Sequence, residues 1–518
     1  MKPLTVVTPY NPGLLFEKTL LSLTKSDLVE RVEIISQAPV HFKMERCRQL
    51  IAKPLTSHET LSLILAETRT NYLLLMEGRP ISFTTETLEK ILKTAESTNS
   101  GLVYSDFYDE SEHGKTLHPL NDYQPGSVRD DFDFGAMILF AIPPVQKTLS
   151  KYNLISGTQF AGLYDLRLKV SIDHSLCHLQ EPLYSAARTD ESSDTVGVIH
   201  ESVRPCRYDN RSDSFRQLPL HKKIFAYVNS GNRAVQKEME TVFTDYLRKI
   251  GAYLPSHSLK EADEPSESFP VETSIIIPVR NRKETIAEAV KSALSQETDF
   301  PFNVITVDNH STDGTSVILS DLVAKDARLI HRVPKRTDLG IGGCWNEALQ
   351  AKACGRYAVQ LDSDDLYSSS STLQKMIDML RQGNFAMVIG SYTLVSSRLE
   401  EIPPGLIDHG EWTDENGHNN ALRINGLGAP RAFNTSLMRR IGFLNVSYGE
   451  DYAAALRICR HYRIGRIFES LYLCRRWPGN TDAALTIKEM NRNNAFKDWI
   501  RTEEIAARQG VVREGMLE

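Results

Sequence analysis

The chain repeats part of itself, and this duplication constrains its fold more than any other feature of the sequence. Three pairs of segments match in the same order: NYLLLMEGRPISFTTETLEKIL (71–92) with RYAVQLDSDDLYSSSSTLQKMI (356–377), VVTPYNP (6–12) with IIIPVRN (275–281), and EPLYSAARTD (181–190) with ESLYLCRRWPGNTD (469–482). Matches separated by about 270 to 290 residues indicate one duplicated domain rather than a solenoid of short repeats. A length of 518 residues independently suggests two or three domains.

Short apolar segments alternate with amphipathic ones after residue 270. SIIIPV at 274–279 and NVITV at 303–307 predict buried strands, as do YAVQL and FAMVIG further on. Between them, apolar residues spaced i, i+3, i+4, i+7 and i+8 from Ile286 predict a helix, and TSVILSDLVAK predicts another. This alternation is typical of an α/β fold with a mostly parallel sheet covered on both faces. Ligands bind beyond the carboxyl ends of such strands, where Asp308 and Asp362 fall.

The least globular segment separates the two copies. PSHSLKEADEPSESFP at 255–270 is polar and proline-rich and lacks apolar periodicity, so it predicts a linker, and the segment before it looks helical. We therefore expect four parts: a first domain over 1–215, a helical segment and polar linker over 216–270, a second domain over 271–485, and a C-terminal helix or tail over 486–518.

Composition narrows the class of protein. The net charge of −6 argues against a nucleic-acid binder, which usually carries a basic surplus. The seven cysteines are scattered and never spaced as C-x-x-C, so neither a disulfide framework nor a zinc site is indicated. No signal peptide and no membrane-spanning run is recognised. These features predict a cytoplasmic protein, which leaves room for docking at the inner face of a membrane.

The acidic cluster LDSDD follows a predicted strand. Asp362, Asp364 and Asp365 repel one another, by roughly 1 kcal/mol per pair in water and more near a protein surface. An aspartate could cap the helix expected around 371–381, whereas a calcium loop fails because Tyr367 and Leu373 stand where glycine and glutamate are needed. The functional alternative is a D-x-D motif that holds Mg²⁺ or Mn²⁺ against a diphosphate.

The first copy lacks this cluster. Glu77, Arg79 and Pro80 occupy the positions of the three aspartates. Because an arginine cannot ligate a cation and its charge repels one, the first copy is expected to keep the fold without a metal site.

Three further motifs carry polar groups. In VDNHSTDGT (307–315), Asp308 ends a strand, and the rest predicts a loop closed by a helix cap. In SYGEDYAAALRI (447–458), Glu450 and Asp451 either favour the first turn of a helix or place a general base there. The basic pair Lys335 and Arg336 could neutralise phosphate or form a solvated loop, and the nearby GIGG does not match a dinucleotide-binding fingerprint. The histidines show no paired ligand spacing.

Taken in order, five segments of the second half resemble the family 2 glycosyltransferases with the GT-A fold: IIIPVRNRKETIAEAVKSALSQ, VDNHSTDGT, DLGIGGCWNEALQAKACGRYAVQLDSDD, GAPRAFNTSLMRRIGFLN and GEDYAAALRI. The resemblance covers about residues 271–485. The first half looks like a diverged member, since VYSDFYDE (103–110) is similar to a segment of bacterial polysaccharide glycosyltransferases. The resemblance implies two Rossmann-like GT-A domains in tandem, the first degenerate and the second catalytic.

The resemblance also implies roles for individual residues. Asp451 matches the general base of inverting members, beside Glu450, and Asp362 and Asp364 match the metal-binding pair, with Asp364 as the more direct ligand. The expected nucleotide-sugar contacts are Pro278, Arg280, Asn281, Asp308, Asn309, Lys335, Asp362 and Arg476. Two positions depart from the family: many relatives have aspartate in place of Asn309, and some have a metal-binding histidine at about Trp477.

These expectations combine into one function. An inverting enzyme of this kind would move a sugar from a nucleotide-sugar donor, a UDP-sugar as first guess, to a hydroxyl group of a glycan, lipid-linked or protein acceptor. It would use Mg²⁺ or Mn²⁺ and no nucleic acid, and it could form a homodimer. The alternative from another class is a non-catalytic scaffold that binds glycans or partners. A nucleotidyltransferase is disfavoured because PVRNRKETI contains no glycine.

Overall fold

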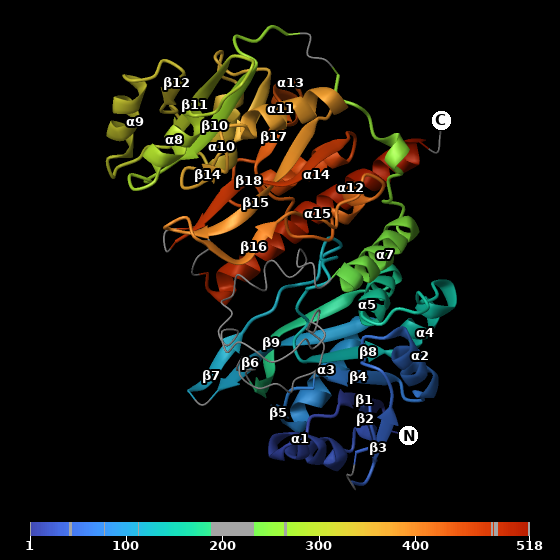
Figure 1. Cartoon of the computed structure of the whole chain (residues 1–518). Helices are drawn as coiled ribbons and strands as arrows, with labels where there is room; N and C mark the ends of the chain where they lie inside the picture. The colour runs from blue at the N-terminus through green and yellow to red at the C-terminus, as the bar shows by residue number, and fades with distance from the viewer. Residues whose placement is uncertain are drawn as a thin grey trace. The chain divides into compact units, whose positions relative to one another are not determined.

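The computed structural model describes residues 2–40, 44–76, 78–111, 113–187, 233–263, 267–477, 480 and 485–515. The chain divides into two compact units, of which the first comprises 1–253 and 486–518 and the second 254–485 (Figure 1). Each unit holds a β-sheet flanked by helices, so the predicted α/β class is confirmed. Of the expected linker region 216–270, residues 216–232 and 264–266 lie outside the described part. No helix of the described residues is both long and apolar enough to cross a bilayer.

The second unit is built on a mixed sheet. In the described residues it has nine strands in the order β12-β11-β10-β13-β17-β15-β18-β14, with β16 paired to β15. The strands are β10 (Thr273–Val279), β11 (Phe302–Asp308), β12 (Leu329–Arg332), β13 (Tyr357–Gln360), β14 (Leu366–Tyr367), β15 (Met387–Ser396), β16 (Glu401–Ile407), β17 (Arg431–Asn434) and β18 (Ile464–Arg476). Pairing is parallel from β12 to β13, and β17 runs antiparallel to both of its neighbours.

The parallel half of this sheet explains its apolar sequence. β11 is buried along its whole length, and β10 is buried except at Pro278, as expected for strands covered on both faces. The helix α8 (Ile286–Leu294) buries Ile286, Ala289, Val290 and Ala293, the positions that the helical spacing predicted. The two predicted strands and this helix are therefore confirmed.

The first unit repeats the strand order of the second. Its sheet runs β3-β2-β1-β4-β8-β6-β9-β5 with β7 paired to β6, which is the order of the second sheet with nine subtracted from each label. The strands are β1 (Leu4–Pro9), β2 (Val29–Ser36), β3 (Cys47–Ile51), β4 (Tyr72–Met76), β5 (Ile81–Phe83), β6 (Leu102–Ser111), β7 (Gly114–His118), β8 (Met137–Ala141) and β9 (Leu176–Ala187). In their described residues, the three matched pairs of segments fall on corresponding elements of the two sheets, so the tandem duplication is confirmed.

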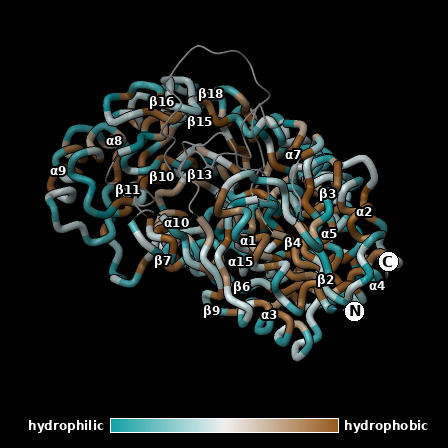
Figure 2. Tube along the Cα trace, turned by 90° about the horizontal axis from the view of Figure 1, so that it is seen from below, coloured by the Kyte–Doolittle hydropathy of each residue, from teal (hydrophilic) through white to brown (hydrophobic). Residues whose placement is uncertain are grey.

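The helices connect and cover these sheets. In the first unit they are α1 (Leu14–Lys25), α2 (His58–Glu67), α3 (Thr85–Thr98), α4 (Ile142–Lys151), α5 (Gly162–Asp173), α7 (Arg233–Lys249) and α15 (Ile487–Gly515). In the second unit they are the 3₁₀ turn η3 (Ser256–Ser258), α8, α9 (Thr315–Val323), α10 (Ile341–Leu349), α11 (Thr372–Gly383), α12 (Gly417–Asn420), α13 (Thr435–Ile441) and α14 (Glu450–Cys459). Apolar residues concentrate along the central strands and polar ones on peripheral loops and helices (Figure 2).

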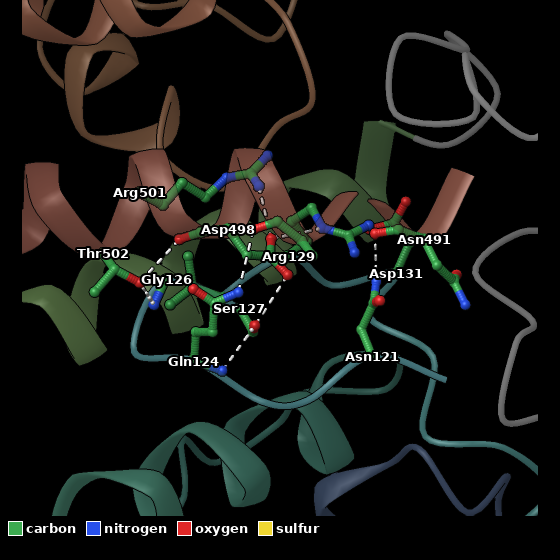
Figure 3. Close-up of polar contacts among 12 residues, drawn as sticks. Asn121, Gln124, Gly126, Ser127, Arg129, Asp131, Asn491, Asp498, Arg501 and Thr502 are labelled. Carbon is green, nitrogen blue, oxygen red and sulfur yellow. Dashed lines mark hydrogen bonds and ion pairs between the residues drawn. The ribbon is translucent and has the colours of Figure 1, made fainter. Parts of the chain in front are cut away.

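The C-terminal helix α15 packs into the first unit through a buried polar network. Asp498 is fully buried and accepts hydrogen bonds from Ser127 Oγ (2.9 Å), Arg129 Nε (3.2 Å) and Arg501 Nη1 (2.8 Å) (Figure 3). A Cβ atom on Gly126 would lie 2.0 Å from the Asp498 carbonyl oxygen, so only glycine allows this approach. The segment expected as a C-terminal helix or tail thus contains the helix α15, which belongs to the first unit.

We predict that Asp498→Ala strongly destabilises the chain. The substitution leaves two buried guanidinium groups, those of Arg129 and Arg501, without a shared counter-charge, which costs about 3 to 5 kcal/mol for buried pairs. Urea denaturation of the full chain measures the free energy of unfolding. Asp27→Ala is the matched control, because Asp27 is fully exposed and forms a surface ion pair with Lys2. Equal stability of the two variants would show that the network contributes little.

Candidate active site

Parallel pairing brings three chain segments to one edge of the second sheet. Val279 at the end of β10 lies beside Asp308 at the end of β11, and Ile276 lies beside Gln360 of β13. The loops that follow these strands therefore emerge together at the carboxyl edge, which is where ligands bind in sheets of this kind. This edge contains the loop from Arg280 onward, the loop after Asp308, and the acidic cluster.

The carboxylate of Asp308 is bound within the protein. Its Oδ1 accepts the backbone N–H of Ser311 (2.9 Å), and its Oδ2 contacts Ser316 Oγ and His331 Nε2, the latter at 3.3 Å. Burial alone would raise the pKa of the Asp308 carboxyl, but the hydrogen bonds from Ser311, Ser316 and His331 outweigh burial and lower it. The side chain has no exposed surface, and its contacts with Ser311 and Ser316 shape the loop after β11.

The other expected nucleotide contacts differ in accessibility. Asn309 is buried; its Nδ2 donates to the Leu339 carbonyl oxygen (2.8 Å), while its Oδ1 is buried without a hydrogen-bond partner. Asn281 adopts a left-handed backbone conformation with φ of 54° and accepts the Thr312 N–H at 2.8 Å, which ties the first two loops together. Arg280 and Lys335 are exposed. Pro278 is partly exposed.

The three aspartates of the acidic cluster have separate environments. Asp365 is buried, and its Oδ1 accepts the backbone N–H of Arg475 at 2.7 Å. Asp362 is partly exposed, and both of its carboxylate oxygens accept from Gln360 Nε2, at 3.1 and 3.2 Å. Desolvation raises the pKa of both carboxyls, and the neighbouring aspartates raise it further. The helix-cap alternative is wrong, because β14 follows the cluster and Ser371 is the N-cap of α11.

Asp364 is held from three sides by residues that motif reasoning did not single out as its partners. Its Oδ2 accepts Trp477 Nε1 at 3.1 Å and Asn480 Nδ2 at 3.3 Å, and Arg282 Nε lies 3.8 Å from the same oxygen. Trp477, at the position where some relatives carry a histidine, therefore does contact Asp364, but as a hydrogen-bond donor. Arg476 precedes it at the end of β18 and is partly exposed.

The Glu-Asp pair occupies the first turn of α14. Gly449 precedes it as the N-cap, with φ of 77°. Asp451 is one-third exposed, and its Oδ2 lies 2.7 Å from Arg431 Nη2. Glu450 is buried, and its Oε2 has no hydrogen-bond partner. Burial, followed by the charge of Asp451, raises the pKa of Glu450 to about 8, so Glu450 is mostly protonated at neutral pH.

Arg431 joins these two regions into one site. Its Nη1 donates to Gln360 Oε1 at 3.1 Å, while Gln360 donates to Asp362. Asp451 and Asp362, 89 positions apart in the sequence, are thus connected through two side chains. The sequence analysis named neither Arg431 nor Gln360. Each lies in or at the end of a strand, and no spacing rule predicts which polar side chain its own side chain contacts.

The carboxylates can be tested as ligands for a divalent cation. Within the described part of the chain, no group of three or more His, Cys, Asp or Glu side chains is arranged to hold a metal ion. Asp362 and Asp364 nevertheless offer hard oxygen donors at the carboxyl edge. Mg²⁺ commonly binds through one or two carboxylates together with substrate phosphates and water, so this pair fits such a cation and Trp477 adds no ligand.

We predict that Asp308→Asn destabilises the protein in a pH-dependent manner. The native pKa of Asp308 is lowered, so its stabilisation is present above the unfolded value of about 4 and is lost as pH falls through the native value. At pH 7 the amide cannot accept all the present hydrogen bonds, which costs about 1 to 3 kcal/mol. Thermal unfolding should show a deficit that shrinks below about pH 4. Asp321→Asn, on the exposed surface of α9, is the control and should behave like wild type at every pH.

Comparison with known proteins identifies relatives of the second unit. The family model described as "Glycosyl transferase family 2" matches residues 274–443. The UDP-Glc:alpha-D-GlcNAc-diphosphoundecaprenol beta-1,3-glucosyltransferase WfaP of Escherichia coli is 31% identical over 189 residues, which cover 36% of this chain and 69% of that protein. An uncharacterized glycosyltransferase of Rickettsia conorii is 27% identical over 203 residues, 38% of this chain and 32% of that protein.

The crystal structure of S. aureus TarS 1–349 in complex with UDP-GlcNAc is 22% identical, with a TM-score of 0.35, and the match covers 45% of this chain and 71% of that one. The chain spans about a third of the length of the mycobacterial and rickettsial relatives that it matches.

Proposed function

Since the chain belongs to glycosyltransferase family 2 through its second unit, we propose that this unit transfers a sugar from a nucleotide-sugar donor to a hydroxyl group of an acceptor, with inversion at the anomeric carbon. The observation that carries the proposal is the connection from Asp451 through Arg431 and Gln360 to Asp362. This connection supports a shared site for the partly exposed Asp451 carboxylate and for Asp362 and Asp364, the pair proposed to bind the cation.

The donor would bind at the carboxyl edge. Arg280 and Lys335 are exposed there and can approach its phosphates, and Arg476 at the end of β18 is the third basic candidate. Asn281 would hold the first loop in shape through its contact with Thr312. Asp308 is buried, so we propose that it acts through the loop it anchors, and Asn309 offers its unpartnered Oδ1 at the same place. Pro278 would line the nucleotide edge.

The leaving group needs its charge balanced. Asp362 and Asp364 would hold Mg²⁺ or Mn²⁺, which when bound would neutralise the negative charge that grows on the departing diphosphate. Arg282, whose Nε lies 3.8 Å from Asp364, balances the charge of this carboxylate from the protein side. Trp477 and Asn480 fix the Asp364 carboxylate through its Oδ2 and so orient its other oxygen.

Asp451 would act as the general base. It would take the proton from the acceptor hydroxyl as that oxygen forms its bond to the anomeric carbon, and the bond to the diphosphate breaks on the opposite face. Its exposure of one third leaves it accessible to an acceptor. Glu450, with a pKa of about 8, is mostly uncharged at pH 7 and so does not add a second negative charge beside the base.

The acceptor and the donor are assigned by class only. The E. coli relative is named for UDP-Glc and an undecaprenol-linked acceptor, which supports a UDP-sugar and a lipid-linked glycan here. A lipid-linked acceptor would bring the protein to the inner face of a membrane. A glycan or protein acceptor would use the same base.

The first unit is proposed to be degenerate. Arg79 stands where the second unit has Asp364, and its Nη1 lies 3.8 Å from Asp109 Oδ1 while its guanidinium packs 5.0 Å from the Phe107 ring. A fixed positive charge at this position repels a divalent cation. Glu77, the counterpart of Asp362, lies outside the described residues. The unit would then serve as a scaffold, bind the acceptor or support a homodimer.

We predict that Asp451→Asn and Asp364→Ala each abolish sugar transfer while the protein stays folded. Loss of a positioned base alone lowers turnover by about 10²- to 10⁴-fold. Turnover is measured as UDP release from a panel of UDP-sugars, and circular dichroism monitors the fold. Asp321→Asn is the matched control in the second unit, and Glu77→Ala is expected to be silent in the first. Near-normal turnover in either active-site variant would refute the assignment.

We also predict that the chain binds UDP together with Mn²⁺. Isothermal titration calorimetry should detect binding to wild type, weaker binding to Asp364→Ala, and tighter Mn²⁺ binding to Trp477→His, because imidazole would add a ligand beside Asp364. A protein that binds neither UDP nor Mn²⁺ would instead support the scaffold that only binds glycans or partners.

A further inference from the structure

We infer that Arg431 is a positioning residue for the base: it holds the Asp451 carboxylate toward the acceptor and couples that orientation to the donor side through Gln360. The inference rests on the proposed function, since it gives Asp451 the role of base. It adds a residue that no motif marks, and it predicts that base and donor site are not independent.

The sheet register puts these side chains together. Val359 of β13 lies opposite Ala432 of β17 in an antiparallel pair, so the next residues along, Gln360 and Arg431, are neighbours across the strands. Gln360 is 7% exposed and Arg431 side chain 12%, so both are largely removed from solvent. Charge-assisted hydrogen bonds are stronger in such a setting than at a surface.

The chemistry of the three groups fixes the orientation of the Gln360 amide. A guanidinium can only donate hydrogen bonds, so the amide oxygen of Gln360 must face Arg431 Nη1, 3.1 Å away. An ionised carboxylate can only accept, so the amide nitrogen must face Asp362, at 3.1 and 3.2 Å. Reversing the amide would break both contacts. Arg431 has its other terminal nitrogen, Nη2, on Asp451, so one planar group orients the base and the bridge together.

The charges around Asp451 come from several elements. Among the described residues they include Arg431 from β17 and Glu450 from α14 itself, and Asp362 beyond β13 lies close enough to Glu450 to raise its pKa. Of the helices packed against α14, α10 carries Cys344 and Glu347, the latter 4.0 Å from Arg332, and α12 carries His418, whose Nε2 contacts the Leu254 carbonyl oxygen. Arg431 is a cation in direct contact with the Asp451 carboxylate, 2.7 Å away.

Removing the positive charge of Arg431 changes the pKa of Asp451 in a definite direction. An opposite charge within about 4 to 6 Å typically lowers the pKa of an aspartate by about 1 to 3 units, so neutralising Arg431 raises the pKa of Asp451. The base works only when ionised, so the acidic limb of the pH profile of kcat/KM moves to higher pH. A residue that merely supported the fold would lower activity equally at all pH values.

The experiment compares three full-length variants with wild type. The readout is kcat/KM from pH 4.5 to 8.5, measured by UDP release with Mn²⁺ and the UDP-sugar that wild type turns over fastest. For Arg431→Gln we expect the acidic limb to shift upward by about 1 unit. Arg431→Lys keeps the positive charge but loses the planar, two-pronged guanidinium group. The acidic limb of the kcat/KM profile should therefore stay at the wild-type pH while kcat falls. Arg439→Gln is the matched control, because Arg439 forms an ion pair with Glu267 away from the site, and it should leave the profile unchanged.

The outcomes separate this inference from the proposed function. If Asp451→Asn is inactive but Arg431→Gln keeps the wild-type acidic limb, the positioning role is overturned and the base assignment stands. If Asp451→Asn is fully active, the assignment of Asp451 as the general base is wrong, and the positioning role of Arg431 is overturned with it. Should no sugar in the panel be turned over, the double-mutant cycle of Arg431→Gln and Asp451→Asn in thermal unfolding still tests the contact. Strictly additive effects would overturn it, and non-additive effects would support it.

Discussion

Parallel pairing of β10 with β11 and β13 is the constraint on which the site depends. Because parallel strands end at one edge, the loops after Val279, Asp308 and Gln360 are brought together regardless of their distance in sequence. The antiparallel strand β17 pairs with β13, so Arg431 lies at the same edge. The helix α14, which follows β17 in the chain, contributes Asp451. Each later element adds a side chain to a place that the hydrogen-bonded register has already defined.

Much of this arrangement could be predicted from the sequence. Strand ends and helix starts are visible as changes of apolar periodicity, so Asp362 and the Glu450–Asp451 pair could be located before the structure was known. The position of Asp308 could also be predicted, but not its burial, because Ser316 and His331 reach its carboxylate through the tertiary fold. The contact between Arg431 and Gln360 could not be predicted for the same reason, because it depends on an antiparallel strand register that apolar periodicity does not encode.

The two copies show how a fold can persist while its chemistry changes. The strand order is the same in both units, because it is set by apolar strands and their pairing, which tolerate exchange of loop residues. At the D-x-D position the second unit exposes a carboxylate, whereas the first carries Arg79, tied to Asp109 and Phe107. The first unit also includes α15, on which the charged Asp498, Arg501 and Arg508 are buried beside the apolar Ile500 and Ile505. Apolar periodicity cannot reveal such a helix as part of a core.

The negative charges of the site are compensated in several different ways. Four acidic side chains meet near the carboxyl edge, namely Asp362, Asp364, Glu450 and Asp451, and each is compensated differently. Glu450 avoids charge by protonation, with a pKa of about 8; Asp451 is paired with Arg431; and Asp364 is surrounded by Arg282, Trp477 and Asn480. Asp362 accepts hydrogen bonds from the neutral Gln360 amide, and its pKa is raised, chiefly by desolvation. A cation bound beside Asp362 would offset this desolvation cost, and the same carboxylate is joined to Asp451 through one amide and one guanidinium.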